Sequence, residues 1–538
     1  MRSNGVHGLS GVRIGVVWMG AAALLSGACG EYRDAGASQW YPTSSYQDPN
    51  EGTPETPVPG DRYEAPGTNP FVLAAADPLA TFAADVDTAS YDIFRRDVGL
   101  YGQLPNKDSV RLEEFVNYFH YSYPTPSADA VEPFRISVEA APSPFSPTTL
   151  VRVGIQAKVV PPEAKRPANV VFLVDVSGSM DDPQKLPLVK VTLRAALDAL
   201  DPTDRVSIVT YSGSVGVRLA STAVAERAAI TQAIDGLDAG GSTAGGAGLM
   251  MAYEQAESHF IDGGINHIIL CTDGDFNVGA SSDEAMVKLI TEKRATGITL
   301  TTLGFGFGNL NDAMMEKVAD AGNGSYSVIA TEDQAINYAH SRLLATMVQV
   351  AKDMKIQMAF NPARVRAYRL LGYENRAIAD SDFRVDAVDA GEVGSGHEVT
   401  ALFEVVPMGN AIPTAQNAPP VRESAVDVAA SELPSFGGED LLVTRVRYKD
   451  VGATAEDAAH EVAFAVKIDA LDEVLADASL DFKWAAAVAG FAEILKQSPF
   501  AKPSALGTIQ ELVDEAKGTS ADRIEFADLV KASAALLR

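Results

Sequence analysis

From Asn169 to Val348 the sequence alternates between short apolar segments and longer amphipathic segments, and this alternation limits the possible folds more than any other feature. The apolar segments Val170–Val174 and His267–Cys271 contain almost no polar residues. Unbroken apolar strands are typical of a parallel sheet that is buried on both faces. Amphipathic segments such as Pro183–Leu200, with apolar residues at helical spacing, predict the covering helices. We therefore expect a mostly parallel α/β domain over residues 168–348.

Hydroxyl and carboxylate side chains follow the ends of these predicted strands. They are Asp175, Ser177 and Ser179 after the first strand, Thr243 in a small-residue loop before a helix, and Asp273 after a later strand. Ligands of open α/β sheets bind at the carboxyl ends of the strands, where these loops lie. A donor set of oxygens without sulfur or imidazole favours Mg²⁺, Mn²⁺ or Ca²⁺ over Zn²⁺. The sequence thus predicts a divalent cation site.

The same loops carry a recognisable pattern. Asp175-x-Ser177-x-Ser179, Thr243 and Asp273 resemble the metal-ion-dependent adhesion site of von Willebrand factor type A (VWA) domains. Four longer segments resemble the bacterial YfbK-like VWA lipoproteins: Phe82–Tyr91, Asp175-Val-Ser-Gly-Ser-Met180, Gly241-Ser-Thr-Ala-Gly245 and Thr272-Asp-Gly-Asp-Phe-Asn-Val-Gly279. This second resemblance runs from about residue 79 to the C-terminus.

The resemblance implies a Rossmann-like sheet and an octahedral divalent cation, with Mg²⁺ expected and Mn²⁺ or Ca²⁺ as alternatives. It implies that Ser177, Ser179 and Thr243 coordinate the ion directly. Asp175 and Asp273 would coordinate it directly or through water. One metal position would stay open for an exposed Asp or Glu of a protein partner, and the ion would offset the two carboxylates that otherwise repel that partner.

Other polar motifs are less informative. Asp181, Asp182 and Asp275 are either a second cation site or, by our preferred interpretation, solvated loop carboxylates. The glycine-rich segment Gly304–Gly308 lacks the spacing of the third glycine and the downstream acidic residue of a dinucleotide loop, and it is interpreted as a flexible strand exit. Cys271, within an apolar strand, is expected to be an inert core thiol.

Three functions remain open at this point. The first is a binding protein that engages an acidic residue of a protein partner through the metal. The second is an assembly scaffold with a structural metal, and the third is a metal-dependent hydrolase. Hydrolysis would need a general base besides the metal-binding carboxylates. The sequence contains no His-Glu-x-x-His or Gly-x-Ser-x-Gly motif, so we expect a non-enzyme.

The N-terminus predicts export. A basic start and the apolar run Ile14–Leu25 indicate a signal peptide over residues 1–28. Small residues precede Cys29, as in a bacterial lipoprotein, which implies acylation of Cys29 and a membrane anchor in the cell envelope; the alternative is an ordinary signal peptide with a chance cysteine. Residues 29–78, rich in Pro, Ser, Thr and Gly, predict a flexible tether.

The flanking regions predict further structure on both sides of the α/β domain. A small N-terminal α/β module is expected at residues 79–126, and two strands at 127–167. An antiparallel β-sandwich region at 349–475 and a C-terminal helical region at 476–538 follow. Because strands lie before and after the α/β domain, we hypothesise that this domain is inserted into one sandwich.

The net charge of −28 limits the possible partners. Binding of nucleic acid depends on Lys and Arg that displace counterions from phosphates, so an acidic chain without a basic segment predicts no nucleic-acid partner. The last helix of the α/β domain, expected at Asp333–Val348, leads into the β region. By analogy with other VWA domains, this helix would carry a switching signal when a partner binds.

Overall fold

A computed structural model describes residues 60–84, 87–127, 129–161, 164–242, 245–274, 283–454, 457–467 and 471–537. The chain divides into Met1–Val58 and Pro59–Arg538, and every described residue belongs to the second unit. The predicted signal peptide, Cys29 and most of the predicted tether lie outside the described residues. Among the helices that are described, none combines the length and apolar character needed to cross a bilayer.

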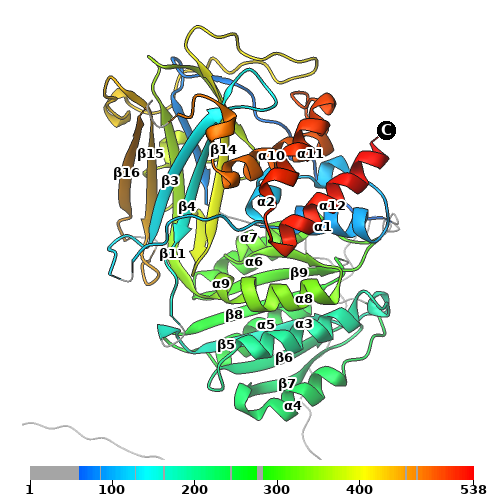
Figure 1. Cartoon of the computed structure of the whole chain (residues 1–538). Helices are drawn as coiled ribbons and strands as arrows, with labels where there is room; N and C mark the ends of the chain where they lie inside the picture. The colour runs from blue at the N-terminus through cyan, green and yellow to red at the C-terminus, as the bar shows by residue number, and fades with distance from the viewer. Residues whose placement is uncertain are drawn as a thin grey trace, which may run out of the picture. The chain divides into compact units, whose positions relative to one another are not determined.

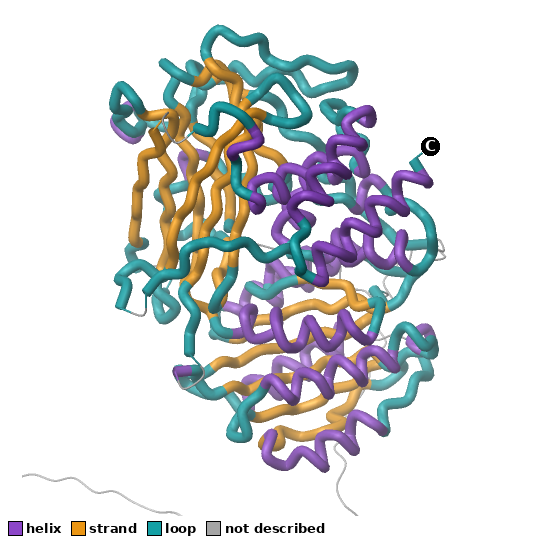
Figure 2. Tube along the Cα trace, in the orientation of Figure 1, coloured by secondary structure: helices purple, strands orange, loops and turns teal. Residues whose placement is uncertain are grey.

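The predicted α/β domain is confirmed as a six-stranded sheet in the order β10-β9-β8-β5-β6-β7 (Figures 1 and 2). All its strands are parallel except β7, which runs antiparallel to β6. The strands are β5 (Ala168–Asp175), β6 (Arg205–Tyr211), β7 (Val215–Ala223), β8 (Ile265–Thr272), β9 (Ile298–Phe305) and β10 (Tyr326–Ile329).

Helices cover both faces of this sheet because alternate residues of each strand point to opposite sides. Phe172 and its same-face neighbours pack with α3, α4 and α8, whereas Val171 and Leu173 pack with α5, α6 and α7. The helices are α3 (Leu186–Ala199), α4 (Arg227–Asp235), α5 (Gly245–Ser258), α6 (Asp283–Arg294), α7 (Asp312–Ala321) and α8 (Glu332–Asn337). The expected last helix is present and contains a π-helix: α8 continues through the π-helix Tyr338–Arg342 into α9 (Leu343–Met347).

The insertion hypothesis is confirmed, because strands from both sides of the α/β domain share one sheet. Strand β4 pairs with β14 over residues 149–156, in the order β1-β12-β14-β4-β3. The facing sheet has the order β13-β11-β15-β16, and β2 also pairs with β11. The strands are β1 (Val72–Leu73), β2 (Leu79–Ala83), β3 (Phe134–Pro142), β4 (Thr149–Ala157), β11 (Gln349–Phe360), β12 (Val365–Leu371), β13 (Gly391–Gly394), β14 (Glu398–Pro407), β15 (Asp440–Lys449) and β16 (His460–Lys467).

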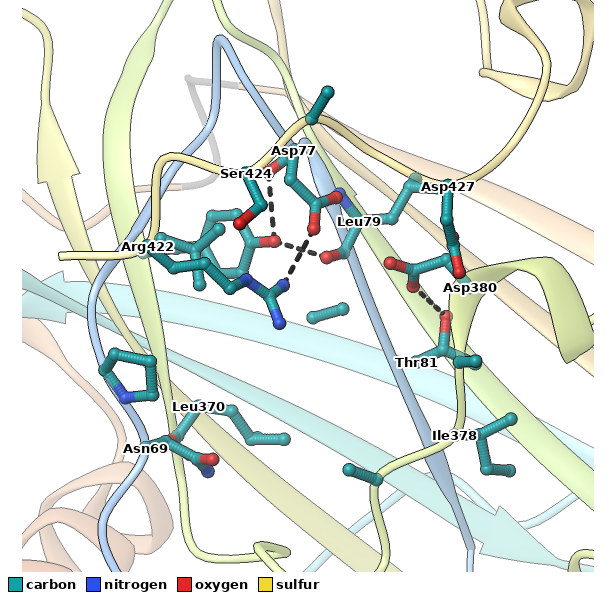
Figure 3. Close-up of a pocket in the computed structure, with 17 residues that line it drawn as sticks. Asn69, Asp77, Leu79, Thr81, Leu370, Ile378, Asp380, Arg422, Ser424 and Asp427 are labelled. Carbon is teal, nitrogen blue, oxygen red and sulfur yellow. Dashed lines mark hydrogen bonds and ion pairs between the residues drawn. The ribbon is translucent and has the colours of Figure 1, made fainter. Parts of the chain in front are cut away.

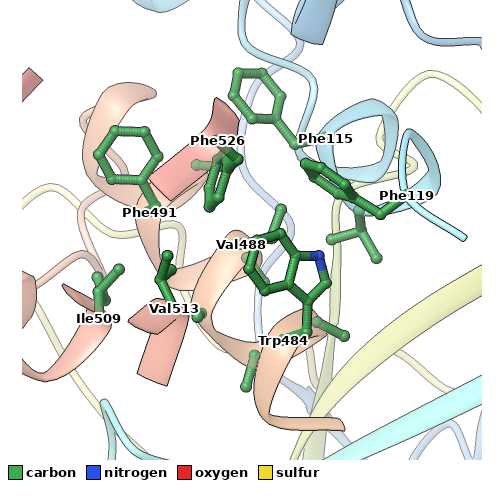
Figure 4. Packing of buried hydrophobic residues seen from close by; sticks show 14 of the residues in the cluster. Phe115, Phe119, Trp484, Val488, Phe491, Ile509, Val513 and Phe526 are labelled. Atoms are coloured by element: carbon green, nitrogen blue, oxygen red, sulfur yellow. The ribbon is translucent and has the colours of Figure 1, made fainter. Parts of the chain in front are cut away.

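The predicted N-terminal module is not a separate unit. Its strand β2 belongs to the sandwich, and its helices share a core with the C-terminal helices (Figure 4). Phe115, Phe119, Trp484, Phe491 and Phe526 meet in this core. Sequence periodicity gives the apolar face of each helix but does not say which distant helix covers it. The helices are α1 (Ala89–Gly99), α2 (Leu112–Asn117), α10 (Leu480–Leu495), α11 (Leu506–Ala516) and α12 (Ala521–Leu536).

The predicted tether, residues 29–78, extends too far toward the C-terminus. Residues 60–78 pack against the rest of the unit, since Phe71 is fully buried and β1 pairs with β12. The backbone of Arg62 also exchanges hydrogen bonds with residues 310 and 312 of the α/β domain. The polar composition on which the prediction rested ends at Gly67, and the apolar residues after it contribute to the sandwich.

Candidate functional site

Asp175 ends β5 and is fully buried. Its Oδ1 accepts a hydrogen bond from the Ser177 backbone N–H at 2.8 Å, and its Oδ2 accepts one from the Thr272 hydroxyl at 3.1 Å. Burial, the largest influence on this group, raises the pKa of the Asp175 carboxyl to about 6. The carboxylate is therefore held in one orientation, in a place where a nearby cation would stabilise its charged form.

The two serines after Asp175 lie together, as the sequence predicts. The hydroxyl oxygens of Ser177 and Ser179 are 3.1 Å apart. Their loop is joined to the small-residue loop by two backbone hydrogen bonds, from Gly178 N to Gly241 O at 3.0 Å and from Gly240 N to Val176 O at 2.8 Å. Thr243 lies outside the described residues, but its loop is described as far as Ser242 and reaches the serines.

Asp273 follows β8 and is also fully buried. The Lys185 ammonium donates to its Oδ2 at 2.9 Å and to Asn309 Oδ1 at 3.0 Å. Burial opposes ionisation of Asp273, but hydrogen bonds with Asn309 and Lys185, together with the Lys185 charge, outweigh it and hold the pKa below its usual range. Asp273 is thus charged and already has one cationic partner.

Lys185 is the functional residue that sequence reasoning missed. It is buried, and its aliphatic stem runs beside Gly306. A Cβ at Gly306, where φ is +81°, would lie 2.5 Å from Lys185 Cε, so a glycine is needed there. A lysine at the start of a helix usually points to solvent. The sequence signal for the burial of Lys185 is the glycine-rich segment at the end of β9, where Gly306 leaves room for the lysine stem.

Gly304–Gly308 is a strand exit, as interpreted, because β9 ends at Phe305, but hydrogen bonds to distant residues hold it in place. Arg96 donates to Gly306 O at 3.0 Å, and Gly308 N donates to Asp61 Oδ1 at 2.7 Å. Asp61 belongs to the segment that was assigned to the tether, and Arg96 belongs to α1. The segment is therefore fixed by groups far away in the sequence, which its local composition cannot reveal.

The described donors fit a hard divalent cation. Asp175, Asp273, Ser177 and Ser179 supply only oxygen atoms, which are the ligands that Mg²⁺, Mn²⁺ and Ca²⁺ prefer. Two carboxylates, one ammonium and a divalent ion give a site charge of about +1. Because Lys185 adds a charge that the donor motif alone does not contain, such a site would be more attractive to an anionic partner than a neutral one.

The other acidic residues of the region differ in their surroundings. Asp181 and Asp182 are exposed, and Asp275 lies outside the described residues. Cys271 is buried in β8, and burial raises the pKa of its thiol far above the usual range, in agreement with an unreactive core residue.

A cavity of about 430 Å³ lies away from this site, at an edge of the β-sandwich between β1 and β2 (Figure 3). Its polar groups pair with one another. Arg422 donates to Asp77 at 2.7 Å, and the Thr81 hydroxyl donates to Asp380 at 2.5 Å. These pairs involve residues of the sandwich and its loops, so the cavity and the cation site are separate features.

We expect replacement of Lys185 with methionine to strengthen binding of a divalent cation by about tenfold, because a positive charge next to the ion is removed and Asp273 Oδ2 is freed. Methionine keeps the apolar stem beside Gly306. Titration with Mn²⁺, monitored by electron paramagnetic resonance, measures the affinity for the cation. Lys190→Met, on the same helix with its ammonium on the Asp235 carbonyl, is the control. An unchanged or weaker affinity in Lys185→Met would contradict the expectation.

Comparison with known proteins agrees with this fold. Residues 169–341 match the von Willebrand factor type A domain family, and residues 57–152 match the family described as von Willebrand factor. Residues 345–536 match the family described as "Uncharacterized protein YfbK, C-terminal". The uncharacterized protein YfbK of Escherichia coli (strain K12) is 38% identical over 480 residues, which cover 87% of this chain and 80% of that protein.

The chain belongs to the YfbK family. VWA domains, such as the one matched in this YfbK-family chain, often bind a divalent metal and generally mediate protein binding.

More distant relatives share only part of the chain. Inter-alpha-trypsin inhibitor heavy chain H4 of Homo sapiens is 30% identical over 161 residues, covering 28% of this YfbK-family chain and 17% of that protein. Among solved structures, a von Willebrand factor type A protein from Catenulispora acidiphila is 18% identical and covers 72% of this chain and 88% of its own, with a TM-score of 0.41.

Proposed function

We propose that this YfbK-family protein binds an acidic side chain of a protein partner through a divalent cation, with Mg²⁺ as the expected ion. Ser177, Ser179 and Thr243 would hold the ion directly, and Asp175 and Asp273 would hold it directly or through water. The observation that carries the proposal is that oxygen donors lie together at the carboxyl ends of β5 and β8, and that the Lys185 ammonium binds Asp273 there. The resulting positive site on an acidic protein favours a partner's carboxylate.

We further propose that the site binds rather than catalyses. Both carboxylates are held by internal partners, Asp175 by Ser177 N–H and the Thr272 hydroxyl, and Asp273 by Lys185. A general base for hydrolysis needs a free lone pair directed at water. In the proposed site the two carboxylates hold the cation, so their lone pairs are not available to take a proton from water.

The proposed location is the bacterial cell envelope, with a lipid anchor at Cys29. The support comes from the sequence alone: an apolar segment followed by small residues and then Cys29. Metabolic labelling with a fatty-acid analogue tests it. Label should enter the wild-type chain and should be absent from Cys29→Ala.

A binding experiment tests the central part of the proposal. The full chain is immobilised and exposed to envelope extract of its source cells, with Mg²⁺ or with chelator. We compare wild type, Asp175→Ala and Ser177→Ala; the second variant removes one hydroxyl and leaves the buried Asp175 in place. Asp235→Ala, which removes an exposed carboxylate of the same domain, is the matched control.

Metal-dependent binding predicts that partners are retained by wild type and Asp235→Ala in Mg²⁺ only. They should be lost with chelator and in both site variants. Recovery of the same partners in every sample would instead favour a scaffold whose contacts do not involve the metal.

A further inference from the structure

Two aromatic side chains stand exposed beside the proposed cation site. Tyr101 follows α1, and Phe307 lies in the loop after β9. Tyr101 is 38% exposed and Phe307 is 42% exposed, although their rings contact each other with centroids 4.6 Å apart. Leu100, next to Tyr101, is 44% exposed. Large apolar side chains that gather on a surface in this way commonly mark an interaction site.

This aromatic pair is held rigidly although it is exposed. The fully buried Arg96 places its guanidinium 4.8 Å from the centre of the Phe307 ring and donates to Gly306 O at 3.0 Å. After Phe307 in the sequence, Gly308 N and Leu310 N donate hydrogen bonds to Asp61, which also pairs with Arg96 at 2.7 Å. The Tyr101 hydroxyl donates to Gln184 Oε1 at 2.5 Å. A rigid aromatic side chain loses little conformational entropy when a partner covers it.

The pair is connected to the cation site through adjacent residues. Gln184, which holds Tyr101, precedes Lys185, whose ammonium contacts Asp273. Gly306, which precedes Phe307, packs against the Lys185 stem, and Asn309 accepts a hydrogen bond from the Lys185 ammonium. Residues 184–185 and 306–309 therefore contact both the aromatic pair and the Lys185–Asp273 ion pair.

We propose that Tyr101 and Phe307 form the apolar half of the partner-binding surface, beside the cation. The partner is a protein segment in which an aliphatic or aromatic side chain lies near the Asp or Glu that binds the metal. This inference rests on the proposed function and extends it from one ionic contact to a two-part recognition element. It also gives α1, which lies outside the VWA domain in the sequence, a part in binding.

The chemistry of the surface supports this partner. A carboxylate on a metal gives a strong but unselective contact, because many proteins expose acidic residues. Tyr, Trp and Phe are enriched in the cores of protein interfaces, and a few such residues supply most of the binding energy. Tyr101 and Phe307 supply such a contact on a protein whose net charge of −28 would repel most acidic surfaces.

The test uses the full chain and a display library of random peptides about 12 residues long, selected in the presence of Mg²⁺. Phe307→Ala and Tyr101→Ala remove the two rings in turn. Phe260→Ala is the matched control, because Phe260 has the same exposed fraction of 42% and lies before β8, at the opposite end of the same sheet. An enriched peptide is then synthesised, and its Kd is measured with each variant.

We expect wild type and Phe260→Ala to enrich peptides that contain an acidic residue together with an apolar one. Phe307→Ala and Tyr101→Ala should retain the acidic preference, lose the apolar one, and bind the synthesised peptide roughly tenfold or more weakly. Acidic peptides without an apolar preference, or equal affinity in Phe307→Ala, would overturn the inference and leave the proposed function intact. Peptides without an acidic residue, or equal binding with chelator, would overturn the proposed function itself.

Discussion

Replacing Arg111 with methionine should lower the free energy of unfolding by about 3–5 kcal/mol, because it leaves buried carboxylates without their cation. Arg111 is 2% exposed and precedes α2. Its guanidinium binds Asp312 of α7 through two hydrogen bonds of 2.7 and 3.1 Å. It also binds Glu114 and lies 3.5 Å from Glu316. This single residue therefore links the segment between β2 and β3 to α7 of the VWA domain.

Urea denaturation, monitored by circular dichroism, measures the free energy of unfolding. The matched control is Arg194→Met, which breaks the exposed ion pair between Arg194 and Asp235 on the same VWA domain. Exposed pairs contribute about 0–1 kcal/mol, so the control should resemble the wild type. If both variants unfold at the same urea concentration, the buried network does not stabilise the protein as we argue.

Replacing Trp484 with alanine should also cost about 3–5 kcal/mol, the usual range for loss of a large aromatic side chain from a core. Trp484 is fully buried in α10 and packs edge-to-face on Phe119 and Phe526, with ring centroids 5.0 and 5.4 Å away (Figure 4). Phe119 comes from the N-terminal part of the chain and Phe526 from α12. The truncation therefore weakens the core that joins the two ends of the described chain.

The variant Trp484→Phe tests whether the loss of stability follows the loss of side-chain volume. Among the residues that the structure describes, none accepts a hydrogen bond from the indole N–H of Trp484, so phenylalanine removes volume without removing such a bond. We expect Trp484→Phe to lose well under half of the stability lost by Trp484→Ala in urea denaturation. Equal losses in the two variants would show that the size of this side chain does not matter to the core.

The VWA fold could be predicted from sequence because local and global signals agree. The apolar strands β5 and β8 can only be buried, and the helices between them carry one apolar face. Asp175, Ser177 and Ser179 follow directly from the end of β5, so their proximity needs little tertiary information. The inserted arrangement also could be predicted, because the number of strands on each side suggested it.

The features that could not be predicted depend on contacts between distant segments. Lys185 has no local signal for burial, and only the neighbouring glycine at position 306 makes room for it. Residues 60–78 were assigned to a linker from their composition, yet Asp61 accepts hydrogen bonds from Gly308 N and Leu310 N in the loop after β9. Tyr101 and Phe307 contact each other although they are about two hundred positions apart in the sequence. Hydrophobic periodicity predicts local structure only and gives no information on such a contact.

Direct titration of the purified full chain with Mn²⁺ tests the central claim, which is a divalent cation site at the ends of β5 and β8. We predict one saturable site in the wild type, loss of that site in Asp175→Ala, and competition of the bound Mn²⁺ by Mg²⁺. Asp235→Ala should titrate like the wild type, since its carboxylate is on the surface. A wild-type chain that binds no Mn²⁺, or an Asp175→Ala chain that binds it with unchanged affinity, would contradict the account.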